Sequence, residues 1–499
     1  MTIFRIAGTA LLGGALTLFA ALGVAADNNV ANQLPDMGTP ADLVLSKADE
    51  YQIGRMVLRG LRDQNQVLED PEVGYYMQHL GSRLSAQTGA DDDRYQYFVV
   101  RDPTVNAFAL PGGFIGVNSG LIMLTSSESE LAGVLAHETA HVRQRHIARA
   151  IQAQSRASLT STAAMLAALL IGAMGGSGDL MLGGLAVGQG IALQQSLNFT
   201  RSEESEADRV GIGLLANAGF NATAMSSFFE QMARNEGLAD SSPLDLLRSH
   251  PVTRERISET RARALQYRNA PVSESPLYVW MRERLRVVVA AGDVNMVNYY
   301  SRLRNSRALT DPERYGEALA QLRQNQPERA VATLRELTES HPDVTGLYGS
   351  LGVALHAAGR KSEAEATFES ALKLFPRNVP LSVHYAEALM QDNKARQAHM
   401  LLLDLFNVVP PTPAQIRLTA LAASAAGDTG DAYYYMSEYH LSGGDLALAN
   451  QQLELALATP NLTSVQRQRF RARQDEVREW LREQQRNNPR AAQSNLNSP

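Results

Sequence analysis

The sequence of 499 residues contains no cysteine. This absence excludes a disulfide framework, a thiolate nucleophile and a zinc or iron–sulfur site with cysteine ligands. It also excludes a lipid attached to a cysteine behind a signal peptide. Any metal ion in this protein must therefore be held by histidine and carboxylate side chains.

Long runs of basic residues are absent as well, and the formal net charge is −6. Because nucleic-acid binding needs a basic patch that neutralises phosphates, we expect no nucleic-acid partner. Hydrophobic residues make up 44% of the chain, which is typical of a globular protein. The length exceeds what one compact core usually holds and predicts two or three domains.

The first 26 residues have the pattern of a secretory signal peptide. Arg5 supplies a short positive region, an apolar run spans about 6–22, and the small residues 24–26 form a cleavage site. A transmembrane anchor is the alternative, but the run is short for a membrane span and contains three glycines. A secreted bacterial chain without a lipid anchor is expected in the periplasm.

The first half of the chain shows a change from extended to helical patterns. Extended segments are predicted at 95–100, 106–110 and 114–117, with a turn at 111–113. Ser127 and Glu130 fit a capping box that begins a helix over about 128–150. A second helix is expected from about 202 to 217.

An apolar segment rich in Ala, Leu, Met and Gly spans 159–194. It fits a buried helical hairpin broken at 175–179, and it also fits an element that dips into a membrane. Each apolar stretch ends before 18 residues, so a spanning helix is not expected.

A repeat of 34 residues starts near 311. Its alanines and prolines recur at Ala330, Ala364 and Ala398 and at Pro342, Pro376 and Pro410. The middle unit matches the tetratricopeptide pattern, in which small residues let two helices approach closely and proline ends the second. In the next unit Asn393 stands where the middle unit has its turn glycine, Gly359. Further helices are predicted at 413–427, 430–442 and 446–458.

The sequence His137-Glu138-Thr139-Ala140-His141 lies within the predicted 128–150 helix. Histidines four residues apart project from one face, so both imidazoles can reach one metal ion. Glu138 beside the first ligand can act as the general base that takes a proton from a metal-activated water and returns it to a leaving amine. A pair of packing histidines is the alternative, and the rarity of this pattern argues against it.

A catalytic metal ion needs a third protein ligand. A histidine ten residues after His137, with a glycine at the seventh, is excluded because position 147 is Ile and position 144 is Gln. His146 is one residue out of that register. On a continuous helix it lies off the ligand face, so we expect it to support a ligand or to lie at the surface.

Glu204 and Asp208 are better candidates for completing the site. They lie four residues apart on one face of the 202–217 helix, where one can bind the metal and the other can orient a ligand imidazole. An acidic, solvated helix face is the alternative. Glu206 is expected to point elsewhere on the helix.

These residues resemble peptidase family M48, a family of zinc metalloproteases, over about 41–265. The resemblance rests on His137–His141, on Glu204-x-x-x-Asp208, and on the flanking segments 106–113 and 249–257. It implies that His137, His141 and Glu204 bind one zinc ion, that Glu138 is the catalytic base and that Asp208 supports a ligand. It also implies an edge strand around 106–117 that pairs with an extended substrate through backbone hydrogen bonds.

The resemblance implies a mostly α fold. An α+β zincin-like metallopeptidase domain with a small sheet is followed by an all-α tetratricopeptide-repeat solenoid. The expected boundaries are a signal peptide at 1–26, a flexible leader at 27–40, an M48 metallopeptidase domain at 41–270, a helical linker at 271–310, a repeat domain at 311–484 and a disordered tail at 485–499.

His250 has three possible roles. Because Pro251 follows it, His250 is biased to an extended conformation in a loop or at a helix boundary. It can act in catalysis by stabilising a tetrahedral oxyanion, or it can occupy the fourth metal position and keep the resting enzyme off. The third role is simple packing at a helix N-terminus.

With its signal peptide and repeats, the whole chain resembles the periplasmic M48 members that act in outer-membrane protein assembly. This implies an endopeptidase that degrades misfolded or stalled outer-membrane proteins and assists their assembly. The repeats would recruit substrates or the β-barrel assembly machinery, and 159–194 would supply any peripheral membrane contact. The alternative is a chaperone or scaffold of that assembly with a latent protease.

Overall fold

The computed structural model describes residues 46–89, 94–154, 200–236, 246, 250–292 and 294–487. The predicted signal peptide, the leader, the apolar segment 159–194 and residues 488–499 of the predicted tail lie outside the described residues. Within the part that is described, no helix is both long and apolar enough to cross a membrane.

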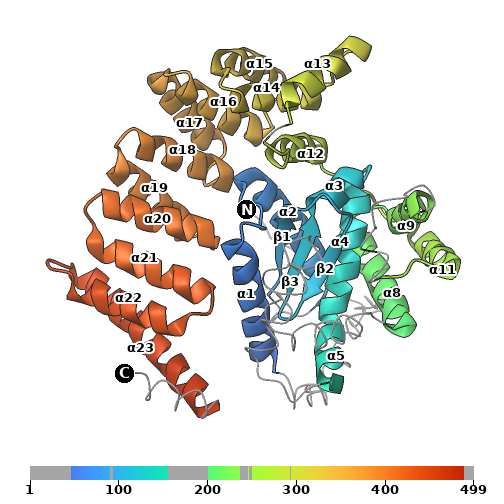
Figure 1. The fold of residues 1–499 in the computed structure, drawn as a ribbon, viewed down its shortest axis with the longest axis horizontal. Helices are drawn as coiled ribbons and strands as arrows, with labels where there is room; N and C mark the ends of the chain where they lie inside the picture. Colours follow the sequence, from blue (N-terminus) through green and yellow to red (C-terminus); the bar gives the residue numbers. More distant parts are fainter. Residues whose placement is uncertain are drawn as a thin grey trace, which may run out of the picture.

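The described residues of the N-terminal half form a three-stranded sheet (Figure 1). Its strands are β1 (Gln96–Val100), β2 (Ala107–Leu110) and β3 (Phe114–Asn118), in the order β1-β3-β2. β3 pairs parallel with β1 and antiparallel with β2. Gly112 and Gly113 have φ angles of 76° and 90°, which let the chain turn tightly between β2 and β3.

This topology corrects one expectation about the substrate edge. The segment 106–117 was expected to form an edge strand as a whole, and for residues 114–117 that expectation is wrong. The turn at 111–113 returns the chain so that β3 lies in the centre of the sheet. Only β2 and β1 lie at edges.

Helices pack around the sheet and position the residues of the candidate site (Figure 1). Helix α4 contacts β2, β3 and helix α8, so it lies between the sheet and the second half of the site. These helices are α1 (Lys47–Asp63), α2 (Pro71–Ser85), α3 (Ser119–Leu124), α4 (Glu128–Arg143), α5 (His146–Gln154), α8 (Arg201–Asn217), α9 (Thr223–Glu236) and α11 (Arg254–Ala264), with a 3₁₀ turn η4 (Leu265–Tyr267).

The predicted 128–150 helix is divided into two. Helix α4 ends at Arg143, and α5 begins at His146. Between them Arg145 has a φ of 53°, a left-handed conformation that a continuous helix cannot contain. Predicting one continuous helix was therefore wrong, and the break changes where His146 lies.

The C-terminal half is helical throughout its described residues, which confirms the mostly α fold with a small sheet and a repeat array. Its helices are α12 (Leu277–Val288), α13 (Met296–Ser306), α14 (Asp311–Arg323), α15 (Pro327–Ser340), α16 (Thr345–Ala357), α17 (Lys361–Leu374), α18 (Val379–Gln391), α19 (Ala395–Phe406), α20 (Pro413–Ala425), α21 (Thr429–Ser442), α22 (Leu446–Ala458) and α23 (Ser464–Asn487). Helix α23 continues three residues into the segment that was expected to be a tail.

The repeat is visible in the backbone of the turns. Left-handed residues recur at intervals of 34: Asn325, Gly359, Asn393 and Gly427, with φ angles of 56°, 77°, 59° and 83°. Glycine and asparagine both tolerate this conformation, which explains why Asn393 replaces the glycine without loss of the turn. The interval thus continues to Gly427, one unit beyond Asn393.

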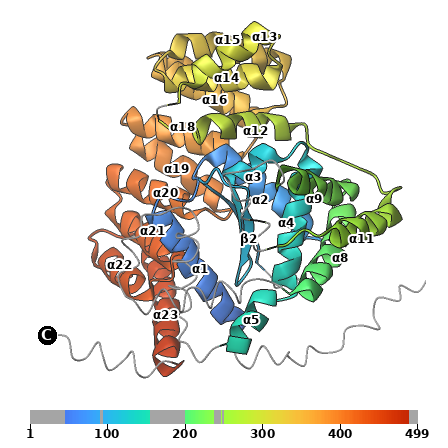
Figure 2. The same ribbon diagram turned by 45° about the vertical axis from the view of Figure 1, so that its right-hand side comes forward.

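The repeat array curves alongside the sheet-containing part (Figures 1 and 2). Helix α1 faces the C-terminal repeats, where Arg55 Nη1 donates to the carbonyl oxygen of Leu441 at 2.8 Å and Arg59 lies 3.4 Å from Asp445. At the other end, α2 contacts α12 and α18. The two halves of the chain are therefore joined at two separate places.

Candidate metal centre

Helix α4 carries His137, Glu138 and His141 into the interior of the protein. All three side chains are buried, although they are polar. The helical spacing places the rings of His137 and His141 one turn apart, with their Nε2 atoms separated by 3.1 Å. Two imidazole nitrogens thus point at one position, as the sequence predicted.

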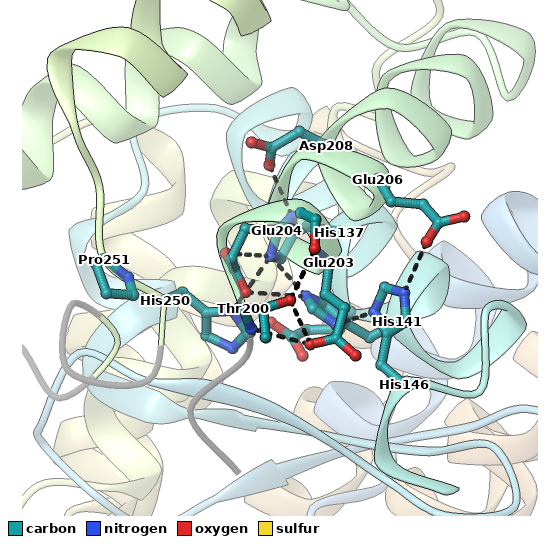
Figure 3. Close-up of polar contacts among 12 residues, drawn as sticks. His137, His141, His146, Thr200, Glu203, Glu204, Glu206, Asp208, His250 and Pro251 are labelled. Atoms are coloured by element: carbon teal, nitrogen blue, oxygen red, sulfur yellow. Dashed lines mark hydrogen bonds and ion pairs between the residues drawn. The ribbon is translucent and has the colours of Figure 1, made fainter. Parts of the chain in front are cut away.

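Helix α8 brings a carboxylate to the same position. The Thr200 hydroxyl and Glu203 form a capping box that begins this helix, and Glu204 follows in its first turn. Glu204 Oε2 lies 3.6 Å from His137 Nε2, and Oε1 lies 3.5 Å from His141 Nε2. Figure 3 shows these side chains converging from two helices.

Asp208, one turn further along α8, contacts the opposite nitrogen of His137. Its Oδ1 lies 2.9 Å from His137 Nδ1, on the side of the ring away from Glu204 (Figure 3). A carboxylate at Nδ1 keeps a proton there and leaves Nε2 free to bind a metal ion. This is the supporting position that the sequence predicted for Asp208.

His250 enters the cluster from a third segment. Its Nδ1 lies 2.7 Å from Glu204 Oε1 and 3.3 Å from His137 Nε2, and its Nε2 lies 3.6 Å from Glu138 Oε1. The His250 amide donates to the carbonyl of Leu246 at 2.8 Å. His250 therefore lies among the ligand atoms, and it is buried with them.

The charges in this cluster are strongly coupled. Burial raises the pKa of Glu204, but His250, His137 and His141 outweigh it and hold the pKa far below its usual range. Burial lowers the pKa of His141 well below its ordinary value. Burial also lowers the pKa of His137, yet hydrogen bonds with Asp208 and Glu204 raise it to about 10. An ionised Glu204 beside a neutral His141 is the charge state that metal ligands require.

The donor set fits a divalent metal ion. One donor atom from each of His137, His141, Glu204 and His250 lies within 4.8 Å of the others. Neither carboxylate oxygen of the buried Glu138 has a hydrogen-bond partner among the described residues. A buried carboxylate without a donor is costly, and a site that hydrates a metal ion beside it explains why the sequence retains one.

Two residues of the site were not assigned from the sequence. Arg256 donates from Nε and Nη2 to the two oxygens of Asp208, both at 2.9 Å, and its Nη1 lies 2.7 Å from Glu204 Oε2. It follows the N-cap Thr253 of helix α11 and lies in the quoted segment 249–257, which was the available signal.

His146 is the second such residue. Rather than lying off the ligand face, it is buried with its Nδ1 2.8 Å from His141 Nδ1. The break at Arg145 causes this difference, since it ends the helical geometry on which the expectation depended.

Comparison with known protein families places two kinds of module in this chain. The model of peptidase family M48 matches residues 72–264. Two tetratricopeptide-repeat models match residues 315–379 and 355–422. The first range contains His137, Glu138, His141, Glu204 and His250.

Relatives share this organisation. The beta-barrel assembly-enhancing protease of Escherichia coli K12 is 31% identical over 90% of this chain and 92% of its own length. A protein of Vibrio cholerae named as a putative beta-barrel assembly-enhancing protease is 36% identical, over 62% of this chain and 64% of its own length. The mitochondrial metalloendopeptidase OMA1 of Schizosaccharomyces pombe is 36% identical over 36% of this chain and 50% of its own length.

Proposed function

The chain belongs to the beta-barrel assembly-enhancing proteases of peptidase family M48, and on that premise we propose that it is a zinc-dependent endopeptidase of the bacterial periplasm. Its substrates are misfolded or stalled outer-membrane proteins, whose assembly it also assists. The observation that carries the proposal is the convergence of His137, His141 and Glu204 beside the buried Glu138. The predicted signal at 1–26 and the absence of cysteine support the location.

We assign one zinc ion per chain to His137, His141 and Glu204. Two imidazoles and one carboxylate are a common donor set for catalytic zinc, which keeps a further position for water or substrate. When bound there, zinc supplies Lewis-acid chemistry that lowers the pKa of a water and polarises a peptide carbonyl. Asp208 and Arg256 hold His137 and Glu204 in place through the contacts described above.

Glu138 moves the proton in the proposed reaction. Its carboxylate is fully buried next to the ligands and is not committed to a hydrogen bond with any described residue. It can therefore accept a proton from the attacking water and deliver it to the leaving amine nitrogen. A glutamine at this position would keep the shape but could not accept the proton.

The edge strand β2 is the proposed substrate cradle. It lies at one edge of the sheet and contacts helix α4, which carries the catalytic residues. An extended peptide that pairs with β2 gains backbone hydrogen bonds that depend little on its sequence. Such weak selectivity suits a protease that acts on unfolded chains.

His250 is proposed to keep the resting enzyme off. Its Nδ1 is as close to Glu204 as a hydrogen bond allows, and it lies beside the ligand nitrogen of His137. From this position it competes for the fourth metal position against water. Once displaced by substrate, the same side chain lies close enough to contact the developing oxyanion.

The repeat array is proposed to recruit substrates or the outer-membrane β-barrel assembly machinery. Tetratricopeptide arrays present extended concave surfaces that bind peptides and proteins. The relatives' name, which states a role in β-barrel assembly, supports this choice of partner. The closed arrangement of His250 favours a second candidate function, a chaperone or scaffold whose protease is latent.

The variant Glu138→Gln tests the proposed function. It should abolish cleavage of a fluorescent unfolded substrate, with a loss of about 10²–10⁴-fold, while zinc content stays unchanged. Glu255→Gln, the same chemical change at an exposed position, is the control and should cleave normally. Full activity of Glu138→Gln would reject the mechanism. Full complementation of a null strain by this cleavage-deficient variant would favour the chaperone function.

A further inference from the structure

His146 joins a ligand of the candidate metal centre to the surface of helix α8. Its ring is fully buried, with Nδ1 2.8 Å from His141 Nδ1. Its other nitrogen, Nε2, lies 3.3 Å from Glu206 Oε2. Figure 3 shows the three side chains in a row that ends at the ligand His141.

The backbone is bent in a way that places His146 there. Arg145 adopts a left-handed conformation with a φ of 53°, which costs a residue other than glycine about 1 kcal/mol or more. Its guanidinium is held by the buried carboxylate of Glu50, with Nε and Nη2 at 2.8 and 2.6 Å from Oε1. The Glu50–Arg145 pair thus stabilises a break without which His146 would lie off the ligand face.

The hydrogen bonds of this row are consistent with one arrangement of protons. If His141 binds a metal ion through Nε2, its proton lies on Nδ1 and is donated to Nδ1 of His146. The proton of His146 then lies on Nε2, where it is donated to Glu206. Each donor meets an acceptor, and Nε2 of His141 is left with its lone pair facing His137 and Glu204.

We propose that His146 is a positioning residue that, with Glu206, fixes the tautomer and ring orientation of the ligand His141. The other ligand is treated in the same way, since Asp208 contacts Nδ1 of His137 directly. Three acidic residues of α8 therefore serve the site: Glu204 as a ligand, Asp208 through one histidine and Glu206 through two. This inference rests on the proposed function, because it concerns support of a metal ligand.

The test measures zinc affinity of the full-length protein by competition with a chromophoric chelator. His146→Leu removes the acceptor for His141 and should weaken zinc binding about 10–100-fold. His146→Asn places an amide oxygen where Nδ1 stood and should restore affinity to within a fewfold of the wild type. His399→Leu, which replaces a buried histidine of the repeat array, is the matched control and should leave affinity unchanged.

The outcomes separate this inference from the proposed function. If the wild type binds no zinc, the proposed function fails. If the wild type and His399→Leu bind zinc and His146→Leu binds it equally well, only the positioning role fails. A merely structural role predicts equal losses for Leu and Asn. Should His146→Leu not fold, the partly exposed Glu206→Ala decides: a loss of severalfold supports the inference, and unchanged affinity overturns it.

Discussion

The Nε2 atom of His384 lies 2.9 Å from both carboxylate oxygens of Glu72, which joins helix α18 of the repeat array to helix α2 beside the sheet. Arg284 of helix α12 lies 2.8 Å from the same carboxylate and 2.7 Å from Asp70. The charged groups of this contact are largely buried. A pair of opposite charges that is shielded from water couples the two halves of the chain.

This contact predicts a pH-dependent stability. Burial lowers the pKa of His384, but Glu72 outweighs it and raises the pKa from 6.5 to about 10. The stabilisation from His384 is thus fully present below pH 6.5 and is lost as the pH rises towards 10. Burial raises the pKa of Glu72, but Arg284 and His384 hold it well below its ordinary 4.5, so its contribution is lost as the pH falls below 4.5.

The variant His384→Gln keeps a hydrogen-bond donor but cannot become charged. Urea unfolding should show a free-energy gap to the wild type of about 1.5–3 kcal/mol at pH 6, the range for hydrogen bonds to charged groups. The gap should narrow as the pH approaches 10. A gap that stays constant from pH 6 to pH 10 would contradict the charged state of His384.

The close packing of α8 on α4 predicts a second effect. A Cβ atom on Gly211 would lie 3.2 Å from the backbone of Ala136 and from the Cα of His137. Gly211→Ala should therefore displace α8, lower the free energy of unfolding by about 1–3 kcal/mol and weaken zinc binding. Thermal unfolding and chelator competition measure these changes.

Gly213→Ala is the matched control in the same helix. Its Cβ would meet only the Tyr267 hydroxyl, at an ordinary 3.6 Å, so the substitution should stabilise the helix by about 0.5–1 kcal/mol. If Gly211→Ala were as stable as this control and bound zinc as tightly, the two helices would not fix the ligand geometry.

His250→Ala should raise the cleavage of an unfolded substrate. If the competent state is about 10% populated at rest, removing the competing side chain increases the rate roughly tenfold. The melting temperature should stay close to that of the wild type. His79→Ala, at an exposed position on α2, is the control. Reduced cleavage by His250→Ala would instead indicate an oxyanion role, and unchanged cleavage would exclude both roles.

Local sequence signals were sufficient for most of the fold. The helix α8 begins with its own capping box at Thr200 and Glu203, and the repeats are recorded in the spacing of Ala330, Ala364 and Ala398, all buried. Such features depend on residues a few positions apart. The central place of β3 was missed because strand order depends on pairing with β1, which lies about 18 residues earlier in the chain.

The candidate site was predicted only as far as helical spacing reaches. His137, His141, Glu204 and Asp208 lie as one or two turns of regular helix require. His146 was misplaced because Arg145 has no intrinsic preference for a left-handed conformation. The partner that stabilises this conformation, Glu50, lies 95 residues away in the sequence and has no local signal.

The central claim is that Glu204 completes a zinc site with His137 and His141. The most direct test is the zinc content of purified, dialysed protein measured by elemental analysis. The wild type and Glu138→Gln should each hold about one zinc ion per chain, because Glu138 is not a ligand. Glu204→Ala should lose the zinc. If Glu204→Ala still held one zinc ion per chain, the assignment of the third ligand would be contradicted.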